Sequence, residues 1–341
     1  MARKEGRSFL TKAKSNKKDE FYTQLKDIES ELKHYKSHFK GKVVFCNCDD
    51  PKVSNFFKYF AQNFKELGLK KLITACYKKQ EDEFEAAKSG ERGFYSELIE
   101  GIRPNSNDIE TVNFQGDGDF RSEESIKLLK QADIVVTNPP FSLFREYIAQ
   151  LTKYNKKFLV IGNINAITYK EIFKLIKENR VWLGINLGRG ISGFIVPEQY
   201  ELYGTEVRID NCGNRIISPN NCLWLTNLDI LKRHQDITLT KVYLGNECDY
   251  PTYDNFDGIN VNKTEDIPKD YVGCMGVPIT FLHKYNPDQF EIIKFRKGND
   301  EKDLSIDGKC PYFRILVRNK RLKTKRAKLS KNRASQLELT L

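Results

Sequence analysis

Residues 131–148, QADIVVTNPPFSLFREYI, join a short apolar segment to a helical pattern through an amide, two prolines and an aromatic ring. Residues 133–136 predict a strand that is buried on both faces. Ser142 is the expected cap of a helix beyond the prolines. The apolar residues of that helix recur at the spacing of one face: Leu143, Phe144, Tyr147, Ile148 and Leu151. Prolines end a strand because they lack a backbone donor, but that role does not explain the amide and the ring beside them.

The same alternation of short apolar strands and helical patterns continues along much of the chain. Strands separated by helices in this way imply an α/β fold, with a mainly parallel sheet covered on both faces. The highly charged residues 78–110 predict a peripheral insertion, and residues from 229 onward predict a second, loop-rich region. The other strands are predicted at 43–45, 72–76, 111–114, 158–161 and 181–187, and the other helices within 19–40 and at about 53–64 and 168–179.

The composition is that of a folded chain without a membrane span. With 341 residues, of which 39% are hydrophobic and 12% aromatic, the chain can form one large or two medium domains. Its apolar stretches fall short of the ~20 residues that a membrane helix needs, and residues 1–18 lack the apolar core of a secretory signal. The eight cysteines include no CxxC pair, so we predict no metal site and free thiols in a reducing compartment. We therefore expect a soluble, cytoplasmic protein.

The positive charge of the chain is concentrated at its two ends. Residues 1–18 contain seven Lys and Arg residues and one Glu, and residues 318–333 contain nine Lys and Arg residues and no acid. The net charge of the whole chain is only +11, so the interior is acidic. Basic ends of this kind bind a polyanion through its phosphates, and the alternative is a pair of solvated tails.

Three polar motifs directly follow predicted strands. They are Asn-Cys-Asp-Asp-Pro at residues 47–51, Gly-Asp-Gly-Asp-Phe at residues 116–120 and Asn-Pro-Pro-Phe at residues 138–141. Ligands of α/β sheets bind at the carboxyl ends of the strands. The three motifs therefore predict one common site.

Residues 138–141 suit an amino group carried by an aromatic ring. Each proline has a fixed φ and keeps the preceding residue extended, so the carbonyls of Asn138 and Pro139 are expected to point into a cleft. The Asn138 side chain offers a neutral acceptor oxygen and cannot serve as a general base. If Asn138 and the Pro139 carbonyl accept both N–H bonds of an adenine amine, its nitrogen becomes more tetrahedral and can attack an electrophilic methyl directly. Phe141 would stack on the base, which contributes roughly 1–3 kcal/mol.

Asn138, Pro139, Pro140 and Phe141 resemble the catalytic Asp/Asn/Ser-Pro-Pro-aromatic motif of S-adenosylmethionine-dependent amino-methyltransferases. More narrowly, the chain resembles the EcoRI-type DNA adenine-N6 methyltransferase family over essentially its whole length. The segments that carry this resemblance are DEFYTQ (19–24), FCNCDDPKVSNFFKYF (45–60), GDGDFRS (116–122), QADIVVTNPPFSLFREYI (131–148), LGRGISGFIVPEQYELYGTE (187–206), SPNNCLWLTNLD (218–229) and MGVPITFLHKYNP (275–287).

The resemblance implies a Rossmann-like class I methyltransferase fold with a seven-stranded sheet. It also implies methyl transfer from S-adenosylmethionine to N6 of an adenine that is flipped out of duplex DNA, within a type II restriction–modification system. The expected target is the second adenine of GAATTC. The implied division is a basic arm (1–18), a catalytic domain (19–228) and a DNA-recognition region (229–341). The enzyme is expected to act as a monomer, with its cognate endonuclease on a separate chain.

Two other functions stay open at this point. One is the same amine chemistry on RNA or on a protein side chain, although more than a hundred residues after the predicted sheet favour duplex DNA. The other is a DNA-binding protein that uses a methyltransferase scaffold without catalysis. The intact residues 138–141 argue against this second function.

The resemblance also assigns residues to the cofactor. Asp117 is an alternative to Asp119 as the partner of the cofactor adenine, and Phe120 is expected against the adenine face. Residues 52–56 replace the usual Gly-rich turn of the superfamily. Alternatively, Asp49 or Asp50 only caps the helix that starts near residue 53, and Asp117 and Asp119 are ordinary turn residues. The cofactor residues are Phe21, Tyr22, Thr23, Asn47, Asp49, Asp50, Pro51, Asp117, Asp119 and Phe120.

Residues 188–193 fit the pattern GxGxxG but do not predict a dinucleotide fold. Residues 194–197 read as an extended segment, whereas that fold requires a helix. We predict instead a tight loop beside the flipped base. The predicted DNA contacts are Lys12, Lys14, Lys17, Lys18, Arg189, Arg208 and Arg215.

Overall fold

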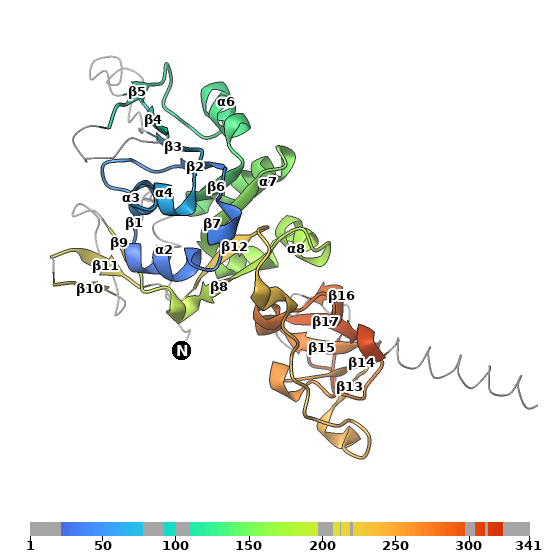
Figure 1. Cartoon of the computed structure of the whole chain (residues 1–341). Helices are drawn as coiled ribbons and strands as arrows, with labels where there is room; N and C mark the ends of the chain where they lie inside the picture. The colour runs from blue at the N-terminus through green and yellow to red at the C-terminus, as the bar shows by residue number, and fades with distance from the viewer. Residues whose placement is uncertain are drawn as a thin grey trace, which may run out of the picture. The chain divides into compact units, whose positions relative to one another are not determined.

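The computed structural model divides the chain into two compact units (Figure 1). The first comprises Met1–Ile172 and Val181–Leu228, and the second comprises Phe173–Arg180 and Asp229–Leu341. The structure describes residues 22–77, 92–99, 109–196, 207–211, 213–218, 221–296, 304–310 and 313–322.

The first unit is built on a sheet that has eight strands among the described residues. Its four central neighbours, β3, β2, β6 and β7, pair in parallel, while β4, β5, β12 and β8 add antiparallel pairs at the two sides. The prediction of seven, mainly parallel strands is therefore corrected to a larger, mixed sheet. In spatial order the strands are β5 (Val112–Asn113), β4 (Phe94–Ile99), β3 (Lys71–Cys76), β2 (Val43–Asn47), β6 (Ile134–Thr137), β7 (Lys157–Asn163), β12 (Cys222–Thr226) and β8 (Trp182–Leu187).

Two strands of this sheet, β4 and β12, are not predicted from the sequence, and β4 lies in the highly charged segment that we expected to be peripheral. It pairs antiparallel with β3, with Leu98 opposite Leu72. Ser96 and Leu98 are buried while their neighbours are more exposed, which is the period of two of a half-buried strand. Phe, Tyr, Leu and Ile make up four of the six residues of β4 but do not alternate with the polar ones, so the sequence lacks the pattern of a half-buried strand.

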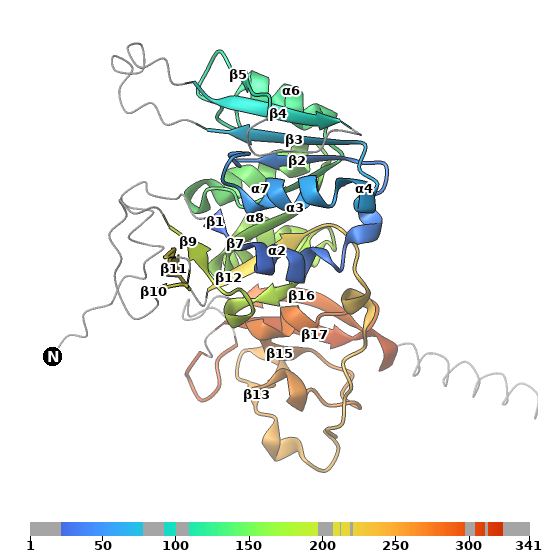
Figure 2. The same ribbon diagram turned by 60° about the vertical axis from the view of Figure 1, so that its left-hand side comes forward.

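Helices cover both faces of this sheet (Figures 1 and 2). On one face lie α2 (Leu25–Leu32), α3 (Asn55–Gln62) and α4 (Phe64–Leu67), and on the other α6 (Glu123–Gln131) and α7 (Phe144–Lys153). Helix α8 (Lys170–Lys177) begins in the first unit and ends in the second.

Helix α7 buries the face that its sequence predicts, with Phe144, Tyr147, Ile148 and Leu151 inside. A 3-10 turn, Phe141–Leu143, precedes it, so Leu143 occupies the cap position. The expected cap, Ser142, lies inside that turn. This part of the prediction is wrong because residues 138–143 turn once more before the helix begins.

A second, smaller sheet in the first unit brings together segments that are far apart in the sequence. All its pairs are antiparallel, and it connects the first described residues to the segment after β8. In spatial order its strands are β1 (Tyr22–Thr23), β9 (Phe194–Ile195), β11 (Arg215–Ile217) and β10 (Val207–Ile209).

The described residues of the second unit form a five-stranded sheet, so the expectation of a loop-rich region is only partly right. Its core consists of short apolar runs such as Ile315–Val317, which are fully buried. No helix in the described part of the chain is long and apolar enough to cross a membrane. The strands, in spatial order, are β13 (Thr252–Tyr253), β14 (Phe256–Asn260), β15 (Met275–Pro278), β17 (Arg314–Asn319) and β16 (Phe290–Arg296).

Candidate active site

A buried carboxylate closes the carboxyl end of β2. Asp49 is 8% exposed, and its two oxygens accept hydrogen bonds of 2.6 Å from the hydroxyls of Ser54 and Thr137. Ser54 caps α3, since its Oγ accepts from the backbone N–H groups of Phe56 and Phe57. Asp49 therefore supports the helix cap instead of forming it.

Burial raises the pKa of two side chains at the end of β2, Asp49 and Cys48. Burial raises the pKa of Asp49 to about 7, although the hydrogen bonds from Ser54 and Thr137 oppose the shift. The pKa of the Cys48 thiol is also raised, first by burial and then by the charge of Asp49. Cys48 has a left-handed φ of 84°, an uncommon value for a side-chain-bearing residue. The chain thus turns sharply at a point from which water is largely excluded.

The two residues that follow Asp49 serve the turn into α3. Asp50 Oδ1 accepts from the backbone N–H of Lys52 at 2.9 Å, and the Asp50 carbonyl accepts from the N–H groups of Val53 and Ser54. Pro51 is buried. These contacts organise the segment that takes the place of a Gly-rich turn.

Residues 138–141 follow β6 directly, and Thr137 ties them to β2. The Thr137 hydroxyl contacts both Asp49 and the backbone carbonyl of Asn47, which is itself buried. Asn138 is partly exposed, although its Oδ1 is covered, and Pro139 is buried. Pro140 and Phe141 are partly exposed.

The ring of Phe141 packs edge-on against the ring of Phe194, with centroids 6.1 Å apart. Phe194 belongs to β9 and is fully buried. The small sheet therefore supports one side of the Asn-Pro-Pro-Phe turn.

Tyr22 and Thr23 reach the same region as strand β1. Thr23 pairs with Phe194, and its carbonyl accepts from the Asn55 side chain at 2.8 Å, at the start of α3. The Thr23 hydroxyl is buried and has no hydrogen-bond partner among the described residues. Since a buried hydroxyl without a partner is costly, this atom is a candidate ligand contact. Phe21 lies outside the described residues.

The carboxylates of Asp117 and Asp119 both take part in their own turn. Asp117 Oδ1 accepts from the backbone N–H of Asp119 at 2.9 Å. The Asp119 carboxylate accepts from the backbone N–H, Nε and Nη2 of Arg121 at 2.7–2.9 Å. Burial alone would raise the pKa of Asp119, but the hydrogen bonds and charge of Arg121 outweigh burial and lower it. Phe120 is 4% exposed and packs edge-on against Tyr147 at 5.0 Å.

The three polar motifs meet at neighbouring strand ends. Thr137 joins the end of β6 to that of β2 through Asp49. At Gly118, whose φ is +80°, an added Cβ would lie 2.7 Å from the carbonyl oxygen of Cys76, so this loop lies directly on the end of β3. Because β3, β2 and β6 are adjacent and parallel, their carboxyl ends share one edge of the sheet.

The loop at residues 188–193 enters a strand, as predicted, and not a dinucleotide-binding helix. A 3-10 turn, Gly188–Gly190, is followed by β9.

Of the predicted DNA contacts, Arg208 is exposed and donates to the carbonyl of Ser192 at 2.8 Å, and Arg215 is partly exposed on β11. The side chain of Arg189 and the four lysines at 12, 14, 17 and 18 lie outside the described residues.

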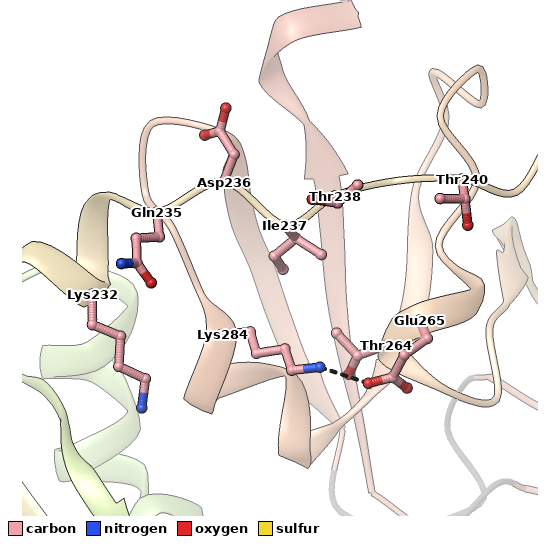
Figure 3. Close-up of a pocket in the computed structure, with 9 residues that line it drawn as sticks. All are labelled: Lys232, Gln235, Asp236, Ile237, Thr238, Thr240, Thr264, Glu265 and Lys284. Carbon is pink, nitrogen blue, oxygen red and sulfur yellow. Dashed lines mark hydrogen bonds and ion pairs between the residues drawn. The ribbon is translucent and has the colours of Figure 1, made fainter.

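The second unit contains a pocket of about 500 Å³ (Figure 3). Its walls carry hydroxyl groups and charges of both signs, including an ion pair of 2.7 Å between Lys284 and Glu265. The side chains of this pair are 51% and 65% exposed, so its charges are available for exchange with a ligand. The lining residues are Lys232, Gln235, Asp236, Ile237, Thr238, Thr240, Thr264, Glu265 and Lys284.

Comparison with known proteins identifies the family of the chain. The family described as "Adenine-specific methyltransferase EcoRI" matches residues 9–320. The chain belongs to this family. It is 68% identical over 324 residues to the type II methyltransferase M.EcoRI of Escherichia coli, which covers 94% of this chain and 99% of that protein. No solved structure matches the chain.

Two mycoplasma proteins are more distant relatives. The type II methyltransferase M.MgeORF184P of Mycoplasma genitalium is 36% identical over 336 residues, covering 92% of this chain and 99% of that protein. The type II methyltransferase M.MpnI of Mycoplasma pneumoniae is 39% identical over 292 residues, covering 84% and 85%. The predicted family and enzyme class, an adenine-specific DNA methyltransferase of the type II class, are therefore confirmed.

Sequence reasoning missed the residues that join the motifs. Thr137 and Ser54 hold the Asp49 carboxylate, and Tyr147 packs on Phe120, but none of the three is among the site residues predicted from the sequence. A signal existed for Ser54, because serine is a preferred helix cap and precedes the apolar face of α3. Nothing in a β-branched Thr137 at the end of an apolar run distinguishes it from a strand residue.

Proposed function

We propose that this methyltransferase transfers the methyl group of S-adenosylmethionine to N6 of an adenine flipped out of duplex DNA, as the modification enzyme of a restriction–modification system. The observation that carries the proposal is the hydrogen bond from Thr137 to Asp49. It links the turn that begins at Asn138 to the end of β2, and thus the proposed base-binding and cofactor-binding residues. Adjacent strand ends of this kind are where α/β sheets bind their ligands.

The proposal includes a Rossmann-like class I fold for the first unit. The consecutive strands β3, β2, β6, β7, β12 and β8, among which β12 alone is reversed, support this assignment. Strand β4 then intervenes between this set and β5 at one edge.

The residues at the strand ends fit S-adenosylmethionine. The buried Thr23 hydroxyl needs a partner that the described chain does not give it. A cationic group beside Asp49 would offset its burial and favour the carboxylate, because an opposite charge lowers the pKa of an acid. We assign the methionine end to Phe21, Tyr22 and Thr23, the ammonium and ribose to Asn47, Asp49, Asp50 and Pro51, and the adenine to Asp117, Asp119 and Phe120.

The bound cofactor supplies an electrophilic methyl on a sulfonium sulfur. Asn138 accepts one N–H of the substrate amine through Oδ1, and the Pro139 carbonyl accepts the other, which directs the nitrogen lone pair away from the ring. Pro140 keeps the turn rigid, and Phe141, backed by Phe194, stacks on the base. Because Oδ1 of Asn138 is covered, its side chain or its neighbours must shift before the adenine amine can reach it.

We assign DNA recognition to residues 229–341, the catalytic domain to residues 19–228 and phosphate contacts to the basic arm, residues 1–18. The start of the second unit at Asp229 supports this division. The proposed recognition site is GAATTC, methylated at its second adenine by a monomer, and the endonuclease is a separate chain. The individual residues that we propose to contact DNA are Lys12, Lys14, Lys17 and Lys18 of the basic arm, and Arg189, Arg208 and Arg215.

The test is methyl transfer from methyl-labelled S-adenosylmethionine to matched substrates. A duplex with one GAATTC site is compared with the same duplex carrying GATATC, with an RNA of the same sequence and with a glutamine-containing protein substrate. We expect N6-methyladenine at the second adenine of GAATTC only, detected by mass spectrometry, and resistance of that duplex to a GAATTC-specific endonuclease. Label on RNA or protein alone, or DNA binding without cofactor binding, would overturn the proposal.

A further inference from the structure

Ser192, in the loop before β9, has every polar atom of its backbone and side chain engaged. Its N–H donates to both carboxylate oxygens of Asp27, at 3.0 and 3.1 Å, and its hydroxyl donates to Asp27 at 2.8 Å. Its Oγ accepts from the Gln24 side chain at 2.8 Å. Its carbonyl accepts from Arg208 and from Ser218 at 2.8 and 2.7 Å. One small residue therefore connects α2, β10 and the end of β11.

Two of the partners of Ser192 are buried at the start of α2. Asp27 and Gln24 are 6% and 9% exposed, and both belong to the first turn of α2 or precede it. Gln24 also donates to the carbonyl of Gly193 at 3.0 Å. Gly193 has a φ of +125°, and an added Cβ would lie 2.4 Å from the carbonyl oxygen of Ile217. The loop thus has little freedom to move away from α2.

The hydrogen bonds of Ser192 and its neighbours lie between two residues that we propose to contact ligands, Thr23 and Phe141. On one side, Gln24 directly follows Thr23, whose buried hydroxyl is the proposed contact to the cofactor. On the other side, Gly193 directly precedes Phe194, which packs against Phe141, the proposed platform for the base. The pairing of Thr23 with Phe194 across β1 and β9 joins the two sides.

We propose that Ser192, held by Asp27 and Gln24, is a positioning residue that fixes the proposed cofactor segment and the proposed base platform relative to each other. This inference rests on the proposed function. A direct attack by an amine nitrogen on a methyl group requires the two reactants to be aligned, and a misplacement of about 1 Å can lower a rate 100-fold. The hydrogen bonds of Ser192 keep that alignment without touching either reactant.

The test uses three variants and a matched control. Ser192→Ala removes the hydroxyl but keeps the backbone bonds to Asp27, Ser192→Thr keeps a hydroxyl, and Asp27→Asn keeps the size of the side chain but removes its charge. Glu29→Gln, at an exposed carboxylate on the same helix, is the control. The measurements are the single-turnover methyl-transfer rate, the Kd of S-adenosylhomocysteine, the Kd of DNA, the thermal midpoint and the fluorescence of a 2-aminopurine placed at the target adenine.

We expect Ser192→Ala and Asp27→Asn to lower the single-turnover rate about 10-fold or more, with a smaller rise in 2-aminopurine fluorescence. The Kd of DNA should change less than about 2-fold, and Ser192→Thr and Glu29→Gln should stay within about 2-fold of the unchanged enzyme. Wild-type rates in Ser192→Ala, with or without a lower thermal midpoint, would overturn the inference and leave only a structural role. If Asp27→Asn does not fold, the comparison of Ser192→Ala with Ser192→Thr decides the question. Failure of the unchanged enzyme to methylate DNA would instead contradict the proposed function.

Discussion

The two units of the chain differ in where their carboxylates lie. Within the described residues, the buried carboxylates are Asp27, Glu31 and Asp49, and all three belong to the first unit. In the second unit the ion pairs Lys284–Glu265 and Arg321–Asp236 lie at the surface, and each of these four side chains is 44% or more exposed.

Buried carboxylates and exposed ion pairs differ in how firmly their partners are fixed. A buried carboxylate is tolerable only when hydrogen bonds satisfy it, as Glu31 is satisfied by Tyr35 and by the backbone N–H groups of Ile185 and Asn186. The hydrogen bonds of such a buried carboxylate keep it and its partners in one geometry. Exposed ion pairs contribute little to stability. Their cations can therefore exchange the carboxylate for a DNA phosphate at a small cost in free energy. We therefore expect substitutions in the first unit to have large, specific effects and those in the second to have small, salt-dependent effects.

The largest expected effect comes from Asn138→Ala. The loss of one of two acceptors for the developing positive charge on the amine should lower kcat about 100- to 1,000-fold, while the Kd of S-adenosylhomocysteine stays within about 2-fold. Steady-state kinetics measures kcat, and calorimetry measures the Kd of S-adenosylhomocysteine. Asn165→Ala, at an exposed amide of the same unit, is the control. Full activity of Asn138→Ala would refute the role assigned to this side chain.

The next effect concerns pH and Asp49. Burial raises its pKa from 3.8 to about 7, so the folded chain retains a proton that the unfolded chain releases. The corresponding stability is present at low pH and is lost as the pH rises from about 4 to about 7, by at most about 1.4 kcal/mol per pH unit. Asp49→Asn cannot ionise. Between about pH 5 and pH 7, the free energy of unfolding in urea should therefore fall more steeply for the unchanged chain than for Asp49→Asn.

The control for this measurement is Asp50→Asn, which alters the adjacent, more exposed carboxylate. Its pH dependence should stay close to that of the unchanged chain, because the charge of Asp50 raises the pKa of Asp49 much less than burial does. Parallel curves for Asp49→Asn and the unchanged chain would mean that Asp49 is not the group responsible, and would weaken the contrast between the two units.

A smaller effect is expected at Thr23. If its buried hydroxyl bonds to the cofactor, Thr23→Val should raise the Kd of S-adenosylhomocysteine about 5- to 30-fold, which corresponds to about 1–2 kcal/mol. Thr23→Ser, which keeps the hydroxyl, should bind nearly normally. Equal affinities for the Val and Ser variants would remove Thr23 from the cofactor contacts.

The smallest effect is expected in the second unit, at Lys284. Lys284→Ala should weaken DNA binding only a few-fold, equally for GAATTC and GATATC duplexes, and reduce the slope of log K against log salt by about 1. Lys70→Ala, at an exposed position of the first unit, is the control. An unchanged salt slope would mean that the Lys284–Glu265 pair does not exchange with phosphate.

The sequence predicts most strands whose apolar runs are continuous, but it misses β4 and β12 of the large sheet. Strands β2, β3, β6 and β7 lie within two residues of their expected ends, because each is buried on both faces and is mostly apolar. Strand β4 is missed because its apolar and polar residues do not alternate, although Ser96 and Leu98 share a buried face. The meeting of the three motifs is predictable, since parallel strands end at one edge.

Long-range polar contacts are not readable from the sequence in this way. Asp27 and Glu31 look like the solvated face of a polar helix, yet both are buried, because their partners lie in β8 and the loop after it. Gly184 shows no turn signal, yet an added Cβ would lie 2.3 Å from Glu31 Oε1. Only the fold brings these partners together.

The hydrogen bond between Asp27 and Ser192 spans 165 positions of the chain. At a synthesis rate of roughly 5–20 residues per second, the ribosome adds the later residue about 8–33 s after the earlier one. Until β8 and then Ser192 have been made, helix α2 lacks the N–H and hydroxyl groups that donate to its carboxylates, and these stay in contact with water. The N-terminal segment therefore reaches its final place late in translation, and a chain released before β9 contains the Asn-Pro-Pro-Phe turn but lacks the strand on which it rests.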